Sequence, residues 1–250
     1  MQFCACGGTH PARLGRRPLF GAAAALALGC SAAGLAPARS ARAADPATPR
    51  TTLTPEQALR LMKEGNDNYR TDAPYRGQQG RERRVELARG QAPFCVLVGC
   101  SDSRVPPELL FGRGLGELFI VRNAGNTVDT AALGSVEYGV GVLGCPLIVV
   151  LGHEACGAVA AAVDVVEKNA TFPGVIGEMV QPIVPAVLEA RRMAGNESLL
   201  DKSIVSNAKR VANRLVTQST LLAEAARTGK LKVVPARYDL DDGDVDFYET

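Results

Sequence analysis

The sequence predicts an α/β domain with a central, mostly parallel β-sheet flanked by helices. Three short apolar runs, PFCVLVG, ELFIVRN and PLIVVLG, show no alternation of polar and apolar residues, which is typical of strands buried on both faces of a parallel sheet. Segments long enough for helices follow the second and third runs. This order of strand, helix, strand and helix favours an α/β domain.

The size and composition of the chain are those of an ordinary globular protein. It has 250 residues, of which 46% are apolar and 22% charged, so it can bury one good-sized core. Five of its 28 Lys and Arg lie in the first 44 residues, which hold none of the 26 Asp and Glu. The slightly basic net charge of +2 therefore comes from the N-terminus, and the remainder is slightly acidic.

Residues 1–44 have the pattern of an export signal. The basic GRRPLF precedes the short apolar GAAAALALG, and small residues lead to SARAAD, as in signals that are cleaved after an A-x-A motif. The adjacent Arg16 and Arg17 indicate the twin-arginine type, so we expect export, to the periplasm. One alternative is that the segment is a presequence of mitochondrial type. A second alternative is that a lipid is attached at Cys30 in LALGC.

The apolar part of this segment is too short to span a bilayer, so no transmembrane anchor is expected. Residues 45–53 are predicted to be a linker, and residues 54–250 the folded domain. Cleavage near Ala43 would leave a single histidine, His153, and four cysteines, Cys95, Cys100, Cys145 and Cys156.

The first half of the domain carries clear local signals. Thr54 can cap a helix that starts at Pro55, a polar loop follows from Thr71 to Gly80, and Arg81 to Arg89 can form a short helix. The segment TVDTAALGSVEYGVGVLG has the length of a crossover helix between the second and third strands.

The second half of the domain is predicted from periodicity and breakers. GAVAAAVDVVEKN is expected to be a helix, whereas Pro182 and Pro185 interrupt any long helix between Phe172 and Arg192. From about Asn196 to Thr228 the apolar residues follow helical spacing, which predicts a helix that packs its apolar face on the core. The last segment, KLKVVPARYDLDDGDVDFYE, indicates two short strands around an Asp-Gly turn.

Chemically reactive side chains follow the first and third predicted strands. The first strand ends in Cys100, Asp102 and Arg104, and the third ends in GHEAC, which holds His153 and Cys156. In open α/β sheets ligands bind beyond the carboxyl ends of the strands. Two thiolates, an imidazole and a carboxylate form a suitable set of zinc ligands.

A disulfide is the competing explanation for cysteines in an exported protein. A bridge between Cys100 and Cys156 would leave His153, Asp102 and Arg104 without a role, so zinc is favoured. Cys95 and Cys145 lie within or beside apolar runs, where a free cysteine packs as a small hydrophobic residue. A bridge between those two remains an alternative.

Asp102 has two competing partners. As a metal ligand it would close the site with four protein ligands, which is typical of structural zinc; paired with Arg104 through two hydrogen bonds, it would leave three ligands and an open position for water. Zinc lowers the pKa of a bound water to about 7, so the open form would be catalytic. The sequence leaves both arrangements open.

Long stretches of the sequence resemble the β-class carbonic anhydrases. The resemblance is carried by CSDSRVPPELLFGRGLGELFIVRNAGN, GSVEYGVGVLGCPLIVVLGHEACGAV and ARYDLDDGDVDF, and it is dense from about Ala92 to Val163. It implies one zinc ion per chain, bound by Cys100, His153 and Cys156, with Asp102 either as fourth ligand or as the partner of Arg104.

The resemblance also implies a reaction and a partner. The reaction is the reversible hydration of carbon dioxide to bicarbonate and a proton by attack of zinc-bound hydroxide, with Asp102 and Arg104 as the catalytic pair of a carbonate dehydratase, a zinc lyase. The family is built on a homodimer, which makes a dimer or a higher even oligomer the expectation. An N-terminal helical arm beginning at Thr54 would wrap the dimer partner.

Two features concern regulation and proton transfer. Leu97 stands where a regulated subset of the family has a tryptophan of an inhibitory bicarbonate site, so inhibition by that route is not expected, although Arg122 matches the arginine of the same pattern. With His153 on zinc, no histidine remains in the mature chain to move protons.

Two other functions could use the same residues. A hydrolase of carbon disulfide or carbonyl sulfide could use the same scaffold, and a non-catalytic zinc protein would keep the site closed by Asp102. Nucleic-acid binding is not expected, because the mature chain is slightly acidic and no basic cluster is interleaved with aromatic residues.

Overall fold

The computed structural model describes residues 49–249. The predicted export signal, with Arg16, Arg17 and Cys30, lies outside the described residues, as do residues 45–48 of the predicted linker. None of the described helices has both the length and the apolar character that a membrane span requires.

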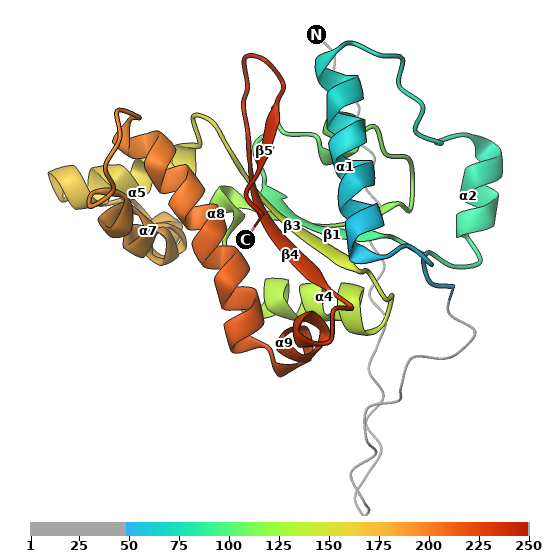
Figure 1. Ribbon diagram of the computed structural model, residues 1–250. Coiled ribbons are helices and arrows are strands. Elements are labelled where there is room, and N and C mark those ends of the chain that lie inside the picture. Colours follow the sequence, from blue (N-terminus) through green and yellow to red (C-terminus); the bar gives the residue numbers. More distant parts are fainter. Residues whose placement is uncertain (1–48, 250) are drawn as a thin grey trace, which may run out of the picture. The chain divides into compact units, whose positions relative to one another are not determined.

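A five-stranded sheet forms the centre of the described domain (Figure 1). Its strands stand in the order β2-β1-β3-β4-β5, and only β5 runs antiparallel to its neighbour. The strands are β1 (Cys95–Cys100), β2 (Leu118–Asn123), β3 (Leu147–His153), β4 (Lys232–Tyr238) and β5 (Val245–Phe247). The α/β fold class predicted from the sequence is thereby confirmed.

Helical segments connect the strands and cover the sheet. They are α1 (Pro55–Arg70), α2 (Arg81–Leu87), α3 (Pro107–Leu110), η1 (Ala124–Asn126), α4 (Thr130–Gly141), α5 (Gly157–Lys168), α6 (Ile176–Val180), η2 (Gln181–Ile183), α7 (Val184–Ala190), α8 (Leu199–Gln218) and α9 (Thr220–Arg227). The short elements α6, η2 and α7 fall where Pro182 and Pro185 were expected to interrupt a longer helix.

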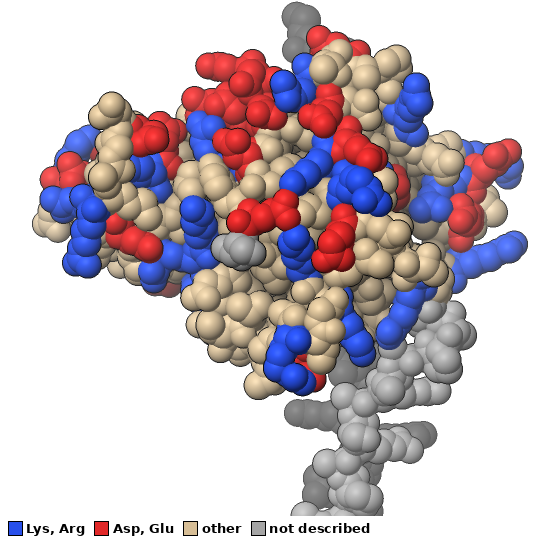
Figure 2. Space-filling model, viewed as in Figure 1, with Lys and Arg blue, Asp and Glu red and all other residues tan. Residues whose placement is uncertain are grey.

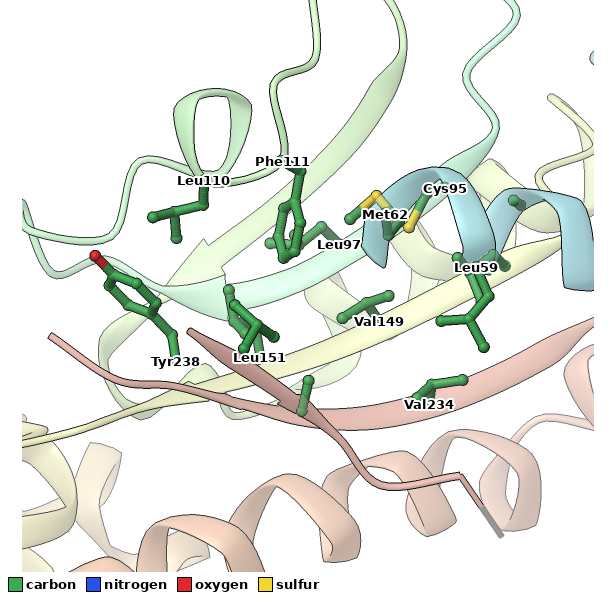
Figure 3. Packing of buried hydrophobic residues seen from close by; sticks show 14 of the residues in the cluster. Leu59, Met62, Cys95, Leu97, Leu110, Phe111, Val149, Leu151, Val234 and Tyr238 are labelled. Carbon is green, nitrogen blue, oxygen red and sulfur yellow. The ribbon is translucent and has the colours of Figure 1, made fainter. Parts of the chain in front are cut away.

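Helix α1 begins as the sequence predicts. The Thr54 hydroxyl accepts a hydrogen bond from Gln57 N, and the Gln57 side chain accepts one from Thr54 N, which makes a complete capping box. The apolar face of α1 packs on the sheet of its own chain through Leu59 and Met62 (Figure 3). Full burial of side chains of this size stabilises the fold by about 2 kcal/mol each.

Alternate residues of the inner strands face two different helical layers. In β1, Cys95 and Leu97 point toward α1, whereas Val96 and Val98 point toward the core that the sheet shares with α4, α8 and α9. Because both faces are covered, the inner strands are apolar at nearly every position, which is why their sequences show no alternation.

The long helix predicted from about Asn196 to Thr228 is two helices. Ser219 has an extended backbone between α8 and α9, where its hydroxyl donates to Glu137 and accepts from Leu222 N to cap α9. The extended backbone of Ser219 thus ends α8 and its side chain starts α9, while the apolar periodicity continues across the break.

The C-terminal strands form a hairpin whose turn is longer than a tight Asp-Gly turn. Residues 239–244 connect β4 to β5, and Gly243 takes a positive φ of 80°. Figure 2 shows acidic side chains gathered over this turn at the top of the view, while lysine and arginine are scattered among acidic residues over the rest of the visible face.

Asn66 links α1 to the hairpin. It is buried, its Nδ2 donates to Gly243 O at 2.9 Å and to Leu110 O at 3.4 Å, and its Oδ1 accepts from Val245 N at 2.9 Å. A buried amide that satisfies three backbone groups fixes the position of the helix on the sheet.

We predict that Asn66→Ala lowers the free energy of unfolding by about 2 kcal/mol, because it leaves buried backbone groups of the hairpin without partners. Chemical denaturation followed by circular dichroism measures the change. Asn68→Ala, at an exposed position of the same helix, is the control; equal stability of the two variants would contradict the role given to Asn66.

Candidate metal centre

Two parallel neighbouring strands bring the predicted ligands together. Cys100 is the last residue of β1, His153 is the last residue of β3, and Cys156 immediately precedes α5. All three side chains are buried, and their ligand atoms lie within 4.8 Å of one another. Strand β1 leads to β2 on one side while β3 lies on its other side, so the cluster occupies the switch point at which α/β sheets bind ligands.

The turn after β3 is shaped to present His153 and Cys156 to the same point. Ala155 takes a left-handed conformation with φ of 49°, which an L-residue adopts at a cost. Glu154 N donates to Tyr238 O of the neighbouring strand at 2.8 Å, which attaches the turn to β4.

The imidazole of His153 is oriented for metal binding. Its Nδ1 lies 2.8 Å from Glu154 O, so Nδ1 carries the proton and donates, and Nε2 keeps a free lone pair. Nε2 is fully buried and has no hydrogen-bond partner. A buried nitrogen left unpartnered beside two thiols is costly unless it binds a ligand, so the residues present fit a zinc ion.

The thiols of Cys100 and Cys156 shift each other's pKa. The Cys156 thiol, with its Sγ 4.0 Å from Cys100 Sγ, lowers the pKa of Cys100 to about 4 against the opposing effect of burial. His153 and the N–H of Gly125, which lies 3.3 Å from the sulfur, act in the same direction as Cys156. The Cys100 thiolate in turn raises the pKa of Cys156. A divalent cation held by both sulfurs would allow both to ionise at this separation.

Asp102 is paired with Arg104 and lies outside the group formed by Cys100, His153 and Cys156. Arg104 Nε donates to Oδ1 at 3.0 Å and Nη2 to Oδ2 at 2.8 Å, which is the two-bond geometry of a guanidinium on a carboxylate. The Arg104 side chain holds the pKa of Asp102 well below its usual range. Asp102 Oδ2 is 3.8 Å from His153 Nε2, so the carboxylate borders the cluster.

Arg104 also contacts the second ligand segment. Its Nη2 donates to Ala155 O at 3.3 Å, so one guanidinium bridges the segment after β1 and the turn after β3. Of the two partners that the sequence left open for Asp102, the structure places Arg104 in hydrogen-bonding contact.

The structure adds two residues for which the sequence indicated no contact with the ligands. Arg122, at the end of β2, donates to Cys100 O and to Asp102 O, both at 2.7 Å, and the Gly125 amide reaches Cys100 Sγ. The available signal was the run RNAGN after the second strand, because the carboxyl ends of β1 and β2 lie at the same edge of a parallel sheet.

Cys95 and Cys145 belong to the core, as expected. Both are buried free thiols, burial raises the pKa of both, and Cys145 Sγ donates to Pro93 O at 3.3 Å. All four cysteines in residues 49–249 are free, so neither of the two disulfides that were weighed is present.

A cavity of about 760 Å³ lies away from this cluster, between the end of α1, the loop 71–80 and residues 109–117. Its lining includes Tyr69, Tyr75, Arg83 and Arg113 but none of the cluster residues. Several of its polar groups are already engaged, since Tyr75 donates to Arg113 O and Arg83 to Leu115 O. The cavity is therefore separate from the cysteine and histidine cluster.

Comparison with known proteins identifies the same segment. Residues 95–245 match the carbonic anhydrase family model. Carbonic anhydrase 2 of Mycobacterium tuberculosis is 40% identical over 189 residues, which are 76% of this chain and 90% of the relative. The carbonic anhydrase of Pseudomonas aeruginosa is 37% identical over 167 residues, 64% of this chain and 75% of the relative.

Solved structures agree with the sequence matches. A β-carbonic anhydrase of Sordaria macrospora superimposes with a TM-score of 0.60 at 26% identity, covering 67% of this chain and 86% of that one. The Coccomyxa β-carbonic anhydrase gives a TM-score of 0.58 at 29% identity, covering 65% and 75%. On these matches and on its cysteine and histidine cluster, the chain belongs to the β-class of the carbonic anhydrase family.

Proposed function

We propose that Cys100, His153 and Cys156 bind one catalytic zinc ion per chain. We propose also that Asp102 and Arg104 are the catalytic pair of the enzyme. The chain is a carbonic anhydrase, which converts carbon dioxide and water reversibly to bicarbonate and a proton. The observation that carries the proposal is the unpartnered, fully buried Nε2 of His153, which faces two thiols.

Zinc, when bound, supplies a Lewis acid that brings the pKa of a coordinated water to about 7. The protein's part is to keep the three ligands fixed. The bond from His153 Nδ1 to Glu154 O sets the tautomer, and the bond from Gly125 N to Cys100 Sγ supports one thiolate.

Asp102 orients the attacking water in this proposal. Its carboxylate stays ionised because Arg104 neutralises it, and an ionised carboxylate at the border of the cluster can accept a hydrogen bond from that water. Arg104 has the second task of keeping the carboxylate turned away from the metal ligands, so that an open position remains for water.

Arg122 supports this pair from the neighbouring strand. By donating to the carbonyls of Cys100 and Asp102 it fixes the backbone that carries one proposed metal ligand and the proposed catalytic carboxylate. The proton released by the reaction goes to water or buffer, since His153 is the one histidine of residues 49–249 and its two nitrogens are in use.

We also propose that the chain works as a homodimer joined at β2. This strand is one of the two edge strands of the sheet, and its residues Leu118 to Val121 are all apolar but only half-buried. An apolar edge strand with unpaired backbone groups invites pairing with another strand. The matched Sordaria macrospora enzyme is described as tetrameric, which is consistent with an even-numbered assembly.

The arm proposed to wrap the partner begins at Thr54, and α2 is the part of this arm that we propose to contact the partner. Helix α1 buries its apolar face on its own sheet, whereas none of the residues of α2 is buried. A helix with no buried side chain has little to hold it in place within one chain, so a partner chain is its proposed support.

Export through residues 1–44 to the periplasm is proposed from the sequence, with residues 54–250 as the catalytic domain. A twin-arginine route is consistent with a metal centre that is built from reduced thiols before export. Lipid attachment at Cys30 is an alternative that the sequence leaves open.

We predict that zinc-loaded Arg104→Ala loses at least about a hundredfold in kcat/KM for carbon dioxide hydration, a loss typical for a positioned acid–base group. The variant frees Asp102 from its charge partner, and stopped-flow assays at matched zinc content measure the effect. Arg60→Ala, which removes an exposed arginine of α1, is the control. Wild-type activity in zinc-loaded Arg104→Ala would exclude the proposed role.

For the dimer, we predict that Val121→Lys places a charge in the β2 interface and yields monomers, whereas the wild-type chain sediments as a dimer or a multiple of it. Val175→Lys adds the same charge at a valine that is 74% exposed and should leave the assembly intact. A monomeric wild type, or an undisturbed dimer in Val121→Lys, would rule out β2 as the interface.

For export, we predict that replacing Arg16 and Arg17 with lysine traps the full-length precursor in the cytoplasm, because the twin-arginine pathway reads the arginine pair. Cell fractionation with an antibody against the domain measures the distribution. Replacing Arg39 and Arg42 with lysine is the control, and normal processing of the Arg16 and Arg17 variant would disprove this route.

A further inference from the structure

Asn207 is a polar side chain in the apolar face of α8. It is 2% exposed and lies between Ile204 and Val211, which are buried in the core. Its Nδ2 donates to Gly125 O at 2.9 Å. A buried amide lowers stability unless it is hydrogen-bonded, so this bond is the reason an asparagine can stand at that position.

Gly125 connects this contact to the cluster. Its carbonyl accepts from Asn207, and its own N–H donates to Cys100 Sγ at 3.3 Å. Its φ is 74°, a conformation that favours glycine. A Cβ at this position would lie 2.6 Å from Ile183 Cδ1 and 3.0 Å from Ala158 Cβ, so the backbone is closely packed on one side.

Glycine has the least conformational preference of all residues. The left-handed conformation of Gly125 must therefore be selected by its surroundings. Asn207 supplies a directional bond to one of the two flanking peptides, and that bond sets how the other peptide points its N–H at the sulfur. The two contacts form a chain of hydrogen bonds from α8 to Cys100.

We propose that Asn207 is a positioning residue of the metal centre, which acts through Gly125 on the sulfur of Cys100. The inference rests on the proposed zinc ligation. An N–H donor withdraws some electron density from a thiolate, but it also stabilises the charge on the sulfur and holds the sulfur where the metal needs it. Groups that support ligands in this way affect metal affinity about 10- to 100-fold. A role confined to packing α8 against η1 would leave the sulfur unaffected.

The test compares two buried asparagines that each donate to a glycine carbonyl. Asn66 also makes this bond at 2.9 Å and is also 2% exposed, but its contacts lie at the hairpin and at Leu110 O. Asn207→Leu and Asn66→Leu each remove one such amide and keep a side chain of similar volume. Asn207→Ser, which is smaller, is measured in the same way and decides the question if Asn207→Leu does not fold.

The readouts are the thiolate-to-metal charge-transfer band of the cobalt-substituted protein and the rate at which the zinc-loaded protein releases zinc to an excess of chelator. We expect the band to move to lower energy and zinc release to become about tenfold faster in the Asn207 variants. In Asn66→Leu both should match the wild type even where stability is lost.

An Asn207 variant whose band and release rate equal those of the wild type or of Asn66→Leu would overturn the inference. A wild-type protein that binds cobalt without any thiolate charge-transfer band would instead overturn the proposed zinc ligation, and the inference with it. The two failures are therefore distinguishable.

Discussion

The parallel pairing of β1 with β3 is the constraint on which the site depends. The register runs from Cys95 opposite Leu147 to Gly99 opposite Leu151, so both strands end at the same edge and deliver Cys100 and His153 side by side. Burial of both strands on two faces fixes that register, since a slip of one residue would exchange the faces of every side chain. The core thus sets the distance between two proposed metal ligands that are 53 positions apart in the chain.

Around this edge, one side chain that bridges the two ligand segments and hydrogen bonds from two other strands, β2 and β4, hold these segments in place. Arg104 joins Asp102 to Ala155 O, and Arg122 from β2 binds the carbonyls of Cys100 and Asp102. The β4 backbone accepts from Glu154 N. These contacts favour a carboxylate that stands beside the cluster rather than in it, which is the arrangement that an enzyme needs and a structural metal site does not.

The sequence predicted what depends on local pattern and left open what depends on long-range geometry. The inner strands and the start of α1 were predictable, because unbroken apolar runs and the capping pair Thr54 and Gln57 act locally. The partner of Asp102 was not predictable, because the proposed metal ligand Cys100 and the ion-pair partner Arg104 are both two residues away in the sequence. The break at Ser219 and the link from Asn207 to Gly125 depend on contacts with residues 82 positions away, for which periodicity gives no signal.

The most direct test is stopped-flow hydration of carbon dioxide by the purified protein, with its zinc content measured in the same samples. We expect activity to rise in proportion to zinc and to be complete at one ion per chain, and we expect Cys156→Ser to lose zinc and activity together. A rate equal to that of buffer alone at full zinc occupancy would contradict this expectation, as would full activity in protein without zinc.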